Sequence, residues 1–193
     1  MFKIFFYINE LKDIQKENLK KLKKVNLIYR NYSRDNYFEN ANKIKEFAKK
    51  FKFKLYISND VNLVRKIKAD GLYIPSFNCI PCYKNKNLEI IGSAHSLKEI
   101  NQKILQGCNE IFLSPIFSTN SHPNSKGKGL YFYRNLKNSI NKKINLFALG
   151  GIGEKSIKKL LNEQCKGFSS ISLIEKKLSN RTIEQLNLIA SNI

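Results

Sequence analysis

The chain has 193 residues, with 35 Lys and Arg against 15 Asp and Glu, so its formal net charge is +20. This length suits a single domain over residues 1–193, and a hydrophobic content of 42% excludes a wholly disordered chain. Because no apolar run reaches the roughly 20 residues that span a bilayer, and the apolar start is too short for a secretory signal, we expect a cytoplasmic protein that does not enter membranes.

Short apolar runs alternate along the chain with longer amphipathic stretches. The runs are predicted to be strands covered on both faces, because they are mostly apolar. In chain order they are Lys3–Ile8, Asn26–Arg30, Lys54–Ser58, Gly71–Ile74, Glu89–Ser93, Glu110–Ser114, Asn145–Leu149 and Gly167–Ser172. The predicted helices are Leu11–Lys24, Tyr37–Lys50, Val61–Lys68, Leu97–Gln106, Tyr133–Ile140, Glu154–Gln164 and Thr182–Ala190.

Eight strands that alternate with helices predict a parallel sheet, because parallel neighbours need crossover connections. Eight is also the number of strands that closes a (β/α)8 TIM barrel. We therefore predict a compact α/β barrel of this class, with an open doubly wound sheet as the alternative. The segment Pro75–Lys86 lacks helical periodicity, so we expect the irregularity of the barrel there.

Polar side chains and glycines gather where the predicted strands end. In barrels of this class the active site lies at the carboxyl ends of the strands, so these residues are the candidates for function. They are Arg30, Asn59, Asp60, Ser93, His95, Thr119, Ser121, His122, Gly150, Gly151, Gly153, Ile171 and Ser172.

The glycines Gly150, Gly151 and Gly153 follow an apolar strand and precede a helix. Glycine lets the backbone approach an anion closely, and the free N–H groups of a helix start suit a phosphate. Loops after the seventh and eighth strands form a common phosphate site in such barrels, so Ile171 and Ser172 would face the same ligand. The sequence favours phosphate binding here over a simple tight turn.

Other polar positions have two interpretations each. Asn59 and Asp60 offer an amide and a carboxylate that could hold Mg²⁺, but Asp60 could equally cap the helix that follows. His122 is either a proton carrier, because histidine titrates near neutrality, or part of a segment that shapes a long loop. For His95 we favour a structural hydrogen-bonding role over catalysis.

The cysteines do not make a disulfide framework in a chain of this length. They are Cys79, Cys82, Cys108 and Cys165. Cys79 and Cys82 have the spacing of a redox or zinc motif, but no second pair or histidine lies at a matching distance, so we favour a structural role for them.

Five segments over nearly the whole chain carry a family pattern. They are Leu55–Asp60, Ala69–Ile74, Ile91–Glu99, Leu113–Thr119 and Ala148–Ile152. In this order they resemble the thiamine phosphate synthase/TenI family, which implies a (β/α)8 barrel. The synthases of that family join hydroxymethylpyrimidine pyrophosphate to thiazole phosphate with Mg²⁺ and release pyrophosphate, whereas its TenI branch isomerises thiazole phosphate.

The resemblance implies roles on the pyrophosphate side of the rim. Asn59 and Asp60 match the family's Asn-Asp pair, in which the carboxylate holds the metal and the amide serves the pyrophosphate. Arg30 matches the arginine that ends the second strand, and Ser93 matches the serine ahead of the His-Ser pair. With His122, these two are the candidate catalytic residues.

The resemblance also implies further substrate contacts. Thr119 and Ser121 match a Thr-x-Thr segment that meets the pyrophosphate. Gly151, Ile171 and Ser172 match the thiazole phosphate site.

The sequence departs from the synthase pattern at four positions, all on the pyrophosphate side. Ile28 stands where the pattern has Gln, and Tyr32 and His122 stand where it has Lys. Asn78 replaces the second metal-binding Asp. This loss of charge is expected to weaken the stabilisation of Mg²⁺ and of the leaving group.

We therefore predict a transferase of the thiamine phosphate synthase type. Its partners would be small phosphorylated pyrimidine and thiazole substrates. A TenI-like thiazole tautomerase and a non-catalytic protein that binds thiazole phosphate are the alternatives, and the sequence leaves the oligomeric state open, a homo-oligomer included.

The net positive charge is weak evidence for nucleic-acid binding, although it is large. Of the 35 basic residues, 30 are Lys, whereas Arg makes the best base and phosphate forks. Asn and Ile are also frequent, at 24 residues each, which fits a bias toward A/T-rich codons. Since the Lys residues are spread along the whole chain, we expect a solvated surface rather than a nucleic-acid site.

Overall fold

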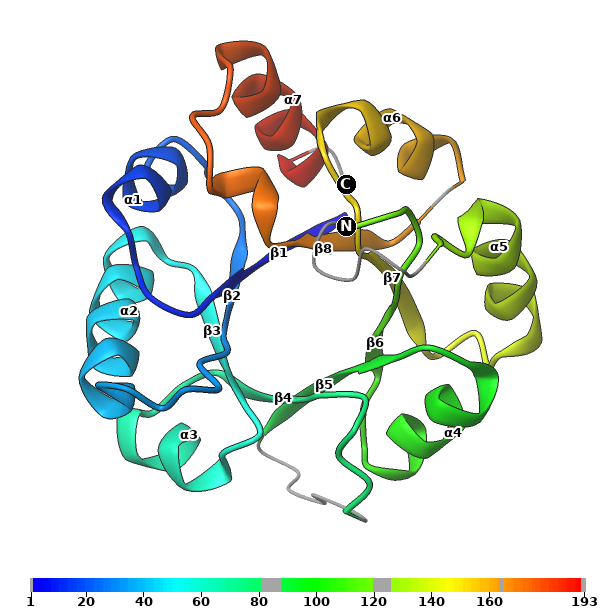
Figure 1. Cartoon of the computed structure of the whole chain (residues 1–193), viewed down its shortest axis with the longest axis horizontal. Coiled ribbons are helices and arrows are strands. Elements are labelled where there is room, and N and C mark those ends of the chain that lie inside the picture. Colours follow the sequence, from blue (N-terminus) through cyan, green and yellow to red (C-terminus); the bar gives the residue numbers. More distant parts are fainter. Residues whose placement is uncertain (1, 81–87, 120–125, 164, 192–193) are drawn as a thin grey trace.

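The computed structural model describes residues 2–80, 88–119, 126–163 and 165–191. Eight parallel strands close into a barrel in chain order, with the helices arranged around it (Figure 1). The strands are β1 Lys3–Ile8, β2 Asn26–Tyr29, β3 Lys54–Ser58, β4 Gly71–Ile74, β5 Glu89–Ala94, β6 Glu110–Leu113, β7 Asn145–Leu149 and β8 Gly167–Ser170. The helices are α1 Asp13–Leu19, α2 Tyr37–Phe51, α3 Val61–Ile67, α4 Leu97–Leu105, α5 Gly129–Ser139, α6 Glu154–Asn162 and α7 Asn180–Ser191, with a short 3₁₀ helix η1 at Ser172–Ile174.

The predicted fold class is confirmed, and so is each predicted strand to within two residues. Between β4 and β5, the described residues 75–80 and 88 form no helix, which agrees with the irregularity expected there. The helices in the described part of the chain include none that is long and apolar enough to cross a membrane.

Several predicted boundaries differ from the structure, two of them by four or five residues. The first helix ends at Leu19 rather than at Lys24, because a tighter turn bond from the Leu22 N–H to the Leu19 carbonyl brings Leu22 into the core. Helix α5 begins at Gly129 rather than at Tyr133, since Leu130 packs against the core and extends the apolar face. The eighth strand stops at Ser170, so Ser172 begins the 3₁₀ helix instead of ending a strand.

Aromatic side chains fill the interior of the barrel. Phe112 lies at its centre, with its ring centroid 4.9 Å from that of Phe5 and 5.4 Å from that of Phe147. The side chains that complete this inner cluster are Tyr7, Ile28, Tyr56, Tyr73 and Ile91. Because these side chains fill the interior of the barrel, a ligand has to bind at one end of the strands.

Ion pairs lie at the amino-terminal end of the strands. Lys3 pairs with Glu110 and Lys54 with Glu89, and the Tyr56 hydroxyl donates to Glu89 Oε2 at 2.6 Å. These contacts link strands that are not adjacent in the barrel, β1 with β6 and β3 with β5, at the end opposite the candidate site.

Glu89 makes the stability of the fold sensitive to acid. Burial acts to raise the pKa of Glu89, but hydrogen bonds from Lys54 and Tyr56 outweigh it and hold the pKa below its ordinary value. Since the folded-state pKa is lowered, Glu89 stabilises the fold above its unfolded pKa of about 4.3 and loses this contribution as the pH falls through the folded-state value.

We expect Glu89→Gln to be less stable than the wild type at pH 7 and to lose less stability on acidification from about pH 5 to pH 3. Urea unfolding at several pH values measures this difference. An identical pH dependence for the two proteins would contradict it.

Candidate functional site

The candidate site lies at the carboxyl ends of the strands, where the parallel ladder brings residues from distant parts of the chain to one rim (Figure 1). The predicted residues that the structure places there are Arg30, Asn59, Asp60, Ser93, Thr119, Gly151, Ile171 and Ser172. Ser121 and His122 lie outside the described residues, as does Cys82. His122 therefore stays a prediction.

Arg30 follows β2 directly, and its N–H donates to the Ile8 carbonyl at 3.0 Å. Its guanidinium carbon lies 4.7 Å from the ring centroid of Tyr7 and 5.3 Å from that of Tyr32. The buried Nε has no hydrogen-bond partner among the described residues. The guanidinium is thus positioned by two aromatic faces rather than by a carboxylate, which leaves its donors for an anion.

Two of the four departures from the family pattern lie within two residues of this arginine. Ile28 belongs to the aromatic interior and is fully buried, so it presents no polar group to the rim. Tyr32 is 59% exposed, and its ring centroid lies 5.3 Å from the guanidinium carbon of Arg30. Tyr32 thus helps to position Arg30, whereas Ile28 contributes to the interior of the barrel.

Asn59, Asp60 and Asn78 come together between β3 and the loop after β4. Asn59 has a left-handed backbone, with φ of 59°, and its side-chain oxygen accepts a hydrogen bond from Asn78 Nδ2. Asn78 is buried, and its own side-chain oxygen accepts from the Ile80 N–H at 2.8 Å, which fixes the orientation of the amide. The position that departs from the family's second carboxylate thus still lies beside the Asn-Asp pair.

Asp60 caps helix α3, as one of its two interpretations predicts. Its Oδ1 accepts from the Leu63 N–H at 2.8 Å. A carboxylate has two oxygens and several lone pairs, so capping a helix and binding a cation are compatible. The N-cap contact also fixes the direction in which the carboxylate points.

These residues fit Mg²⁺ in a limited way. Groups of three or more His, Cys, Asp or Glu side chains that could enclose a metal are absent from the described residues. Mg²⁺ commonly takes only one or two protein carboxylates and completes its shell with water and substrate phosphates. Asp60 with the Asn59 oxygen meets that minimum, provided that the substrate brings phosphate oxygens.

Ser93 is buried at the end of β5, and its Oγ accepts a hydrogen bond from the Tyr73 hydroxyl at 2.7 Å. Burial raises the pKa of Tyr73, so the phenol remains a neutral donor near neutral pH. Because the Tyr73 proton is used in this bond, Ser93 keeps its own proton for a group above the rim.

His95 has a structural role, as expected. Its Nδ1 lies 2.8 Å from the Ser114 carbonyl and its Nε2 lies 3.1 Å from Ser76 Oγ. A carbonyl only accepts, so Nδ1 donates to it, while Nε2 pairs with a serine hydroxyl that can donate or accept. Both ring nitrogens are occupied in joining three loops of the rim.

The glycine loop after β7 is locked against the loop after β6. Gly151 has φ of 64°, and a Cβ on this residue would lie 2.3 Å from the Ser118 carbonyl oxygen. The Phe117 N–H donates to the Gly150 carbonyl at 3.1 Å. Only glycine allows this close approach, which leads the chain into the amino terminus of α6.

Ser170 is a rim residue that the sequence analysis missed. Its hydroxyl donates to the Ile152 carbonyl at 2.9 Å and accepts from the Leu173 N–H at 3.3 Å. It thereby joins the glycine loop to the 3₁₀ helix that begins at Ser172. The signal for it in the sequence was a serine near the carboxyl end of a predicted strand.

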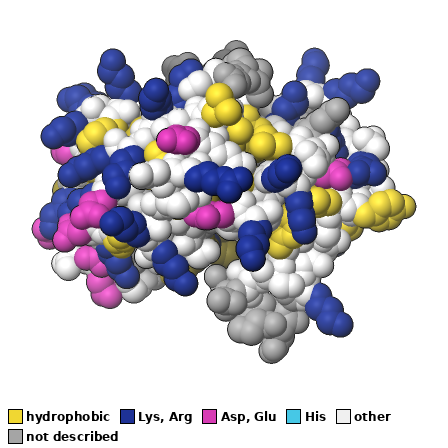
Figure 2. Space-filling model, turned by 90° about the horizontal axis from the view of Figure 1, so that it is seen from above, with side chains coloured by type: hydrophobic (Ala, Val, Ile, Leu, Met, Phe, Trp, Pro, Cys, Tyr) yellow, Lys and Arg dark blue, Asp and Glu magenta, His cyan; other side chains and the backbone are white. Residues whose placement is uncertain are grey.

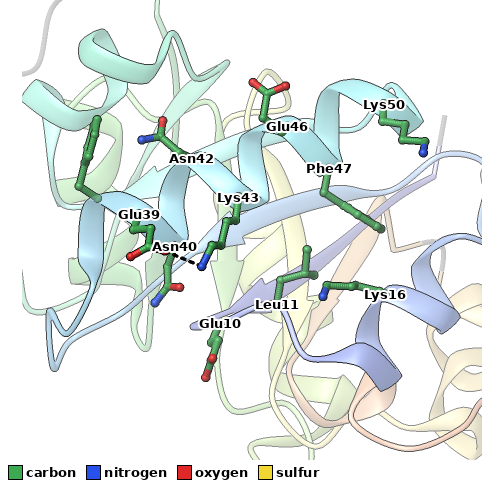
Figure 3. Close-up of a pocket in the computed structure, with 11 residues that line it drawn as sticks. Glu10, Leu11, Lys16, Glu39, Asn40, Asn42, Lys43, Glu46, Phe47 and Lys50 are labelled. Atoms are coloured by element: carbon green, nitrogen blue, oxygen red, sulfur yellow. Dashed lines mark ion pairs between the residues drawn. The ribbon is translucent and has the colours of Figure 1, made fainter.

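A cavity of about 1010 Å³ lies on the outside of the barrel between the start of α1 and helix α2 (Figure 3). Phe47 and Leu11 lie in its wall, and the ion pair of Glu39 with Lys43 lies along α2 at its edge. Both partners of that pair are more than half exposed, so it contributes little to stability. None of the predicted site residues lines this cavity, so it is separate from the candidate site at the strand ends.

The surface charge is dispersed. On the face shown in Figure 2, Lys and Arg side chains lie from one end to the other with acidic side chains among them. On this face the basic residues do not gather into the single stripe that a nucleic-acid duplex requires.

Fold and rim together define a class: a (β/α)8 barrel whose strand ends carry an arginine, an Asn-Asp pair and a glycine loop that leads into the start of a helix. The particular family follows from comparison with known proteins. Residues 9–174 match the thiamine monophosphate synthase family, and the chain belongs to it.

Individual relatives agree with this assignment. An Aquifex aeolicus protein provisionally named thiamine-phosphate synthase 2 is 29% identical over 168 residues, which cover 86% of this chain and 89% of that protein. The thiamine-phosphate synthase of Clostridium acetobutylicum is 28% identical over 163 residues, or 81% of this chain and 76% of the relative. The solved thiamine phosphate pyrophosphorylase of Pyrococcus furiosus has a TM-score of 0.77 at 18% identity, covers 98% of this chain and 95% of its own, and confirms the fold.

Replacing Gly151 tests whether the glycine loop needs its left-handed backbone. We expect Gly151→Ala to lose about 2 kcal/mol or more of unfolding free energy, because a Cβ at φ of 64° is strained and meets a carbonyl oxygen. It should also weaken the binding of inorganic phosphate.

Gly153→Ala is the matched control. A Cβ at Gly153 meets nothing within 4 Å and its φ of −126° is open to any residue, so Gly153→Ala should lose only the preference for Gly over Ala at a helix N-cap, about 1 kcal/mol or less. Urea unfolding compares the two variants. Equal effects would show that the geometry of Gly151 has no special role.

Proposed function

We propose that this protein is a thiamine-phosphate synthase, a transferase that joins hydroxymethylpyrimidine pyrophosphate to thiazole phosphate. The observation that carries the proposal is the family match over residues 9–174, which includes every rim residue discussed above. The relatives named above, which cover most of both chains, support the synthase rather than the tautomerase or a purely binding role.

In the proposed reaction the bond between the pyrimidine methylene carbon and the pyrophosphate oxygen breaks, and the electron pair leaves with the pyrophosphate. The thiazole nitrogen then forms a new bond to that carbon, giving thiamine phosphate. The barrier is dominated by charge that moves onto the leaving group, so groups that stabilise this charge in place have the largest effect.

Arg30 and Ser93 are the proposed donors to the leaving pyrophosphate. The guanidinium is already oriented by Tyr7 and Tyr32, and Ser93 is oriented by the bond from Tyr73. Preorganised donors cost no rearrangement at the moment of reaction, which is why such groups act more strongly than the same groups in water. Thr119, on the loop after β6, is proposed to add a further hydroxyl, with Ser121 and His122 beyond it.

The second substrate is proposed to bind across the rim. The loop at Gly151 and the 3₁₀ helix that starts at Ser172 are joined through Ser170, so one phosphate can meet both. Ile171 is half-buried beside the aromatic interior and offers an apolar contact for the thiazole ring. Holding this ring against the reactive carbon makes the attack effectively intramolecular.

Mg²⁺ is proposed to bind through Asp60 and Asn59 together with the pyrophosphate. A bound Mg²⁺ would neutralise part of the charge of the leaving group. Asn78 donates an N–H toward Asn59, where a second carboxylate would have offered an oxygen. We therefore expect a weaker requirement for the metal than two carboxylates would give.

The proposal is tested by incubating the purified protein with both substrates and Mg²⁺. Thiamine phosphate and pyrophosphate should form in equal amounts. If thiazole phosphate isomerises without any pyrimidine substrate, the tautomerase alternative holds instead, and no turnover of either kind at high protein concentration would contradict both enzymes.

Asp60→Asn separates the charge of Asp60 from its structural role. Asn caps helices about as well as Asp, so the stability of the fold should hardly change. Without the carboxylate, kcat/KM should fall on the order of a hundredfold, with most of the loss at low Mg²⁺. Steady-state kinetics over a range of Mg²⁺ concentrations measure this, and unchanged turnover would exclude Asp60 from metal binding.

A further inference from the structure

Helix α4 buries a positive charge below the pyrophosphate side of the rim. Lys103 is fully buried, and its stem passes over β5 so closely that a Cβ at Gly92 would lie 3.1 Å from Lys103 Cδ. Its Nζ donates to the Asn78 carbonyl at 2.7 Å and to Gln106 Oε1 at 2.9 Å. Two neutral oxygens thus surround the ammonium.

The charge of Lys103 has no ion-pair partner among the described residues, although Glu99, one helical turn earlier, interacts with it electrostatically. All 15 Asp and Glu residues lie within the described part of the chain, and none of them forms an ion pair with Lys103. Fully buried lysines are rare unless they are paired, because removing the ammonium from water is costly. Because no carboxylate forms an ion pair with it, the buried ammonium can still act on an anion that is not part of the chain.

Anchoring the loop does not by itself require a charge. Gln106 already donates to the Asn78 carbonyl at 3.0 Å and to the Ile80 carbonyl at 2.7 Å. These are neutral hydrogen bonds from the same helix to the same loop. The loop would therefore be held by an amide even if position 103 were uncharged.

The location of Lys103 indicates which bound anion its charge would stabilise. The Asn78 carbonyl receives the ammonium, while the Asn78 side chain donates to Asn59 Oδ1, next to Asp60. A single residue thus separates the buried charge from the Asn-Asp pair. In a low-dielectric interior a charge at this range still acts on a neighbouring anion.

We propose that Lys103 is a positioning residue for the pyrophosphate side of the site. It fixes Asn78 beside Asn59 and adds a positive charge below the rim to that of Arg30. This inference rests on the proposed function. It accounts for the exchange of cationic and polar family positions at Ile28 and Tyr32 without a loss of the positive field there. Lys103 touches the loop and not the substrate, so it acts through Asn78 and through space.

Lys103→Met removes the charge and the donor but keeps an unbranched apolar stem. We expect it to raise the KM for the pyrimidine pyrophosphate about tenfold and to weaken the binding of inorganic pyrophosphate with Mg²⁺ by a similar factor. The KM for thiazole phosphate should stay within twofold, which shows that the variant is folded and its other subsite intact.

Gln106→Leu is the control, because it removes the neutral loop bonds and one acceptor of the ammonium but leaves the charge and its bond to the Asn78 carbonyl. It should change the KM for the pyrimidine pyrophosphate clearly less than Lys103→Met does. If the two variants behave alike, or if Lys103→Met leaves pyrophosphate binding unchanged, the role proposed for the charge is wrong.

A second variant tests the role of the charge in case Lys103→Met does not fold. Lys103→Gln keeps a donor for the Asn78 carbonyl but has no charge, so it should also raise the KM for the pyrimidine pyrophosphate, and a wild-type value would overturn the inference. Pyrophosphate binding is measured by calorimetry without turnover. The failure of the wild type to make thiamine phosphate would therefore count against the proposed function, whereas a binding constant independent of Lys103 would count against this inference alone.

Discussion

The seam between β1 and β8 is the contact on which the rest of the molecule depends. At this seam Lys3 pairs with Gly167, and a Cβ at Gly167 would lie only 2.1 Å from the Lys3 carbonyl oxygen. A glycine here lets the first and last strands approach closely enough to complete the parallel ladder. Once the ladder is closed, all eight strands end at one rim, and residues as distant as Arg30 and Ser172 become neighbours of one site.

Several polar side chains of the rim are oriented by contacts with neighbouring side chains. Tyr7 and Tyr32 hold Arg30, Tyr73 holds Ser93, and Asn78 holds Asn59. In each case the group proposed to meet the substrate is oriented by a partner that is buried or stacked. Such preorganisation suits a reaction in which the main task is to stabilise a departing anion.

The sequence predicted the barrel because the pattern is periodic and local. Short apolar runs such as Lys3–Ile8 and Asn145–Leu149 were located to the residue, and a parallel sheet then required one functional rim. The residues proposed to touch substrates could be chosen from that rim with the help of the family pattern. The helix ends were less predictable, since Leu22 turns inward through tertiary packing that periodicity does not show.

Contacts between loops far apart in the chain could not be predicted. Lys103 lies on an amphipathic helix, where a lysine is normally taken as solvent-exposed, and the carbonyl that receives it belongs to Asn78, 25 residues earlier. The bond between Asn78 and Asn59 likewise spans two loops. These contacts depend on how β4 and α4 pack, and a single sequence carries no signal for that.

Both phosphorylated substrates are proposed to bind at one rim, on opposite sides of it. A crystal structure with an unreactive analogue of the pyrimidine pyrophosphate, thiazole phosphate and Mg²⁺ would locate them. We expect the pyrophosphate against Arg30 and Ser93 with the metal on Asp60, and the thiazole phosphate at Gly151 and Ser172. Either ligand bound elsewhere, for example in the cavity between α1 and α2, would contradict this proposal.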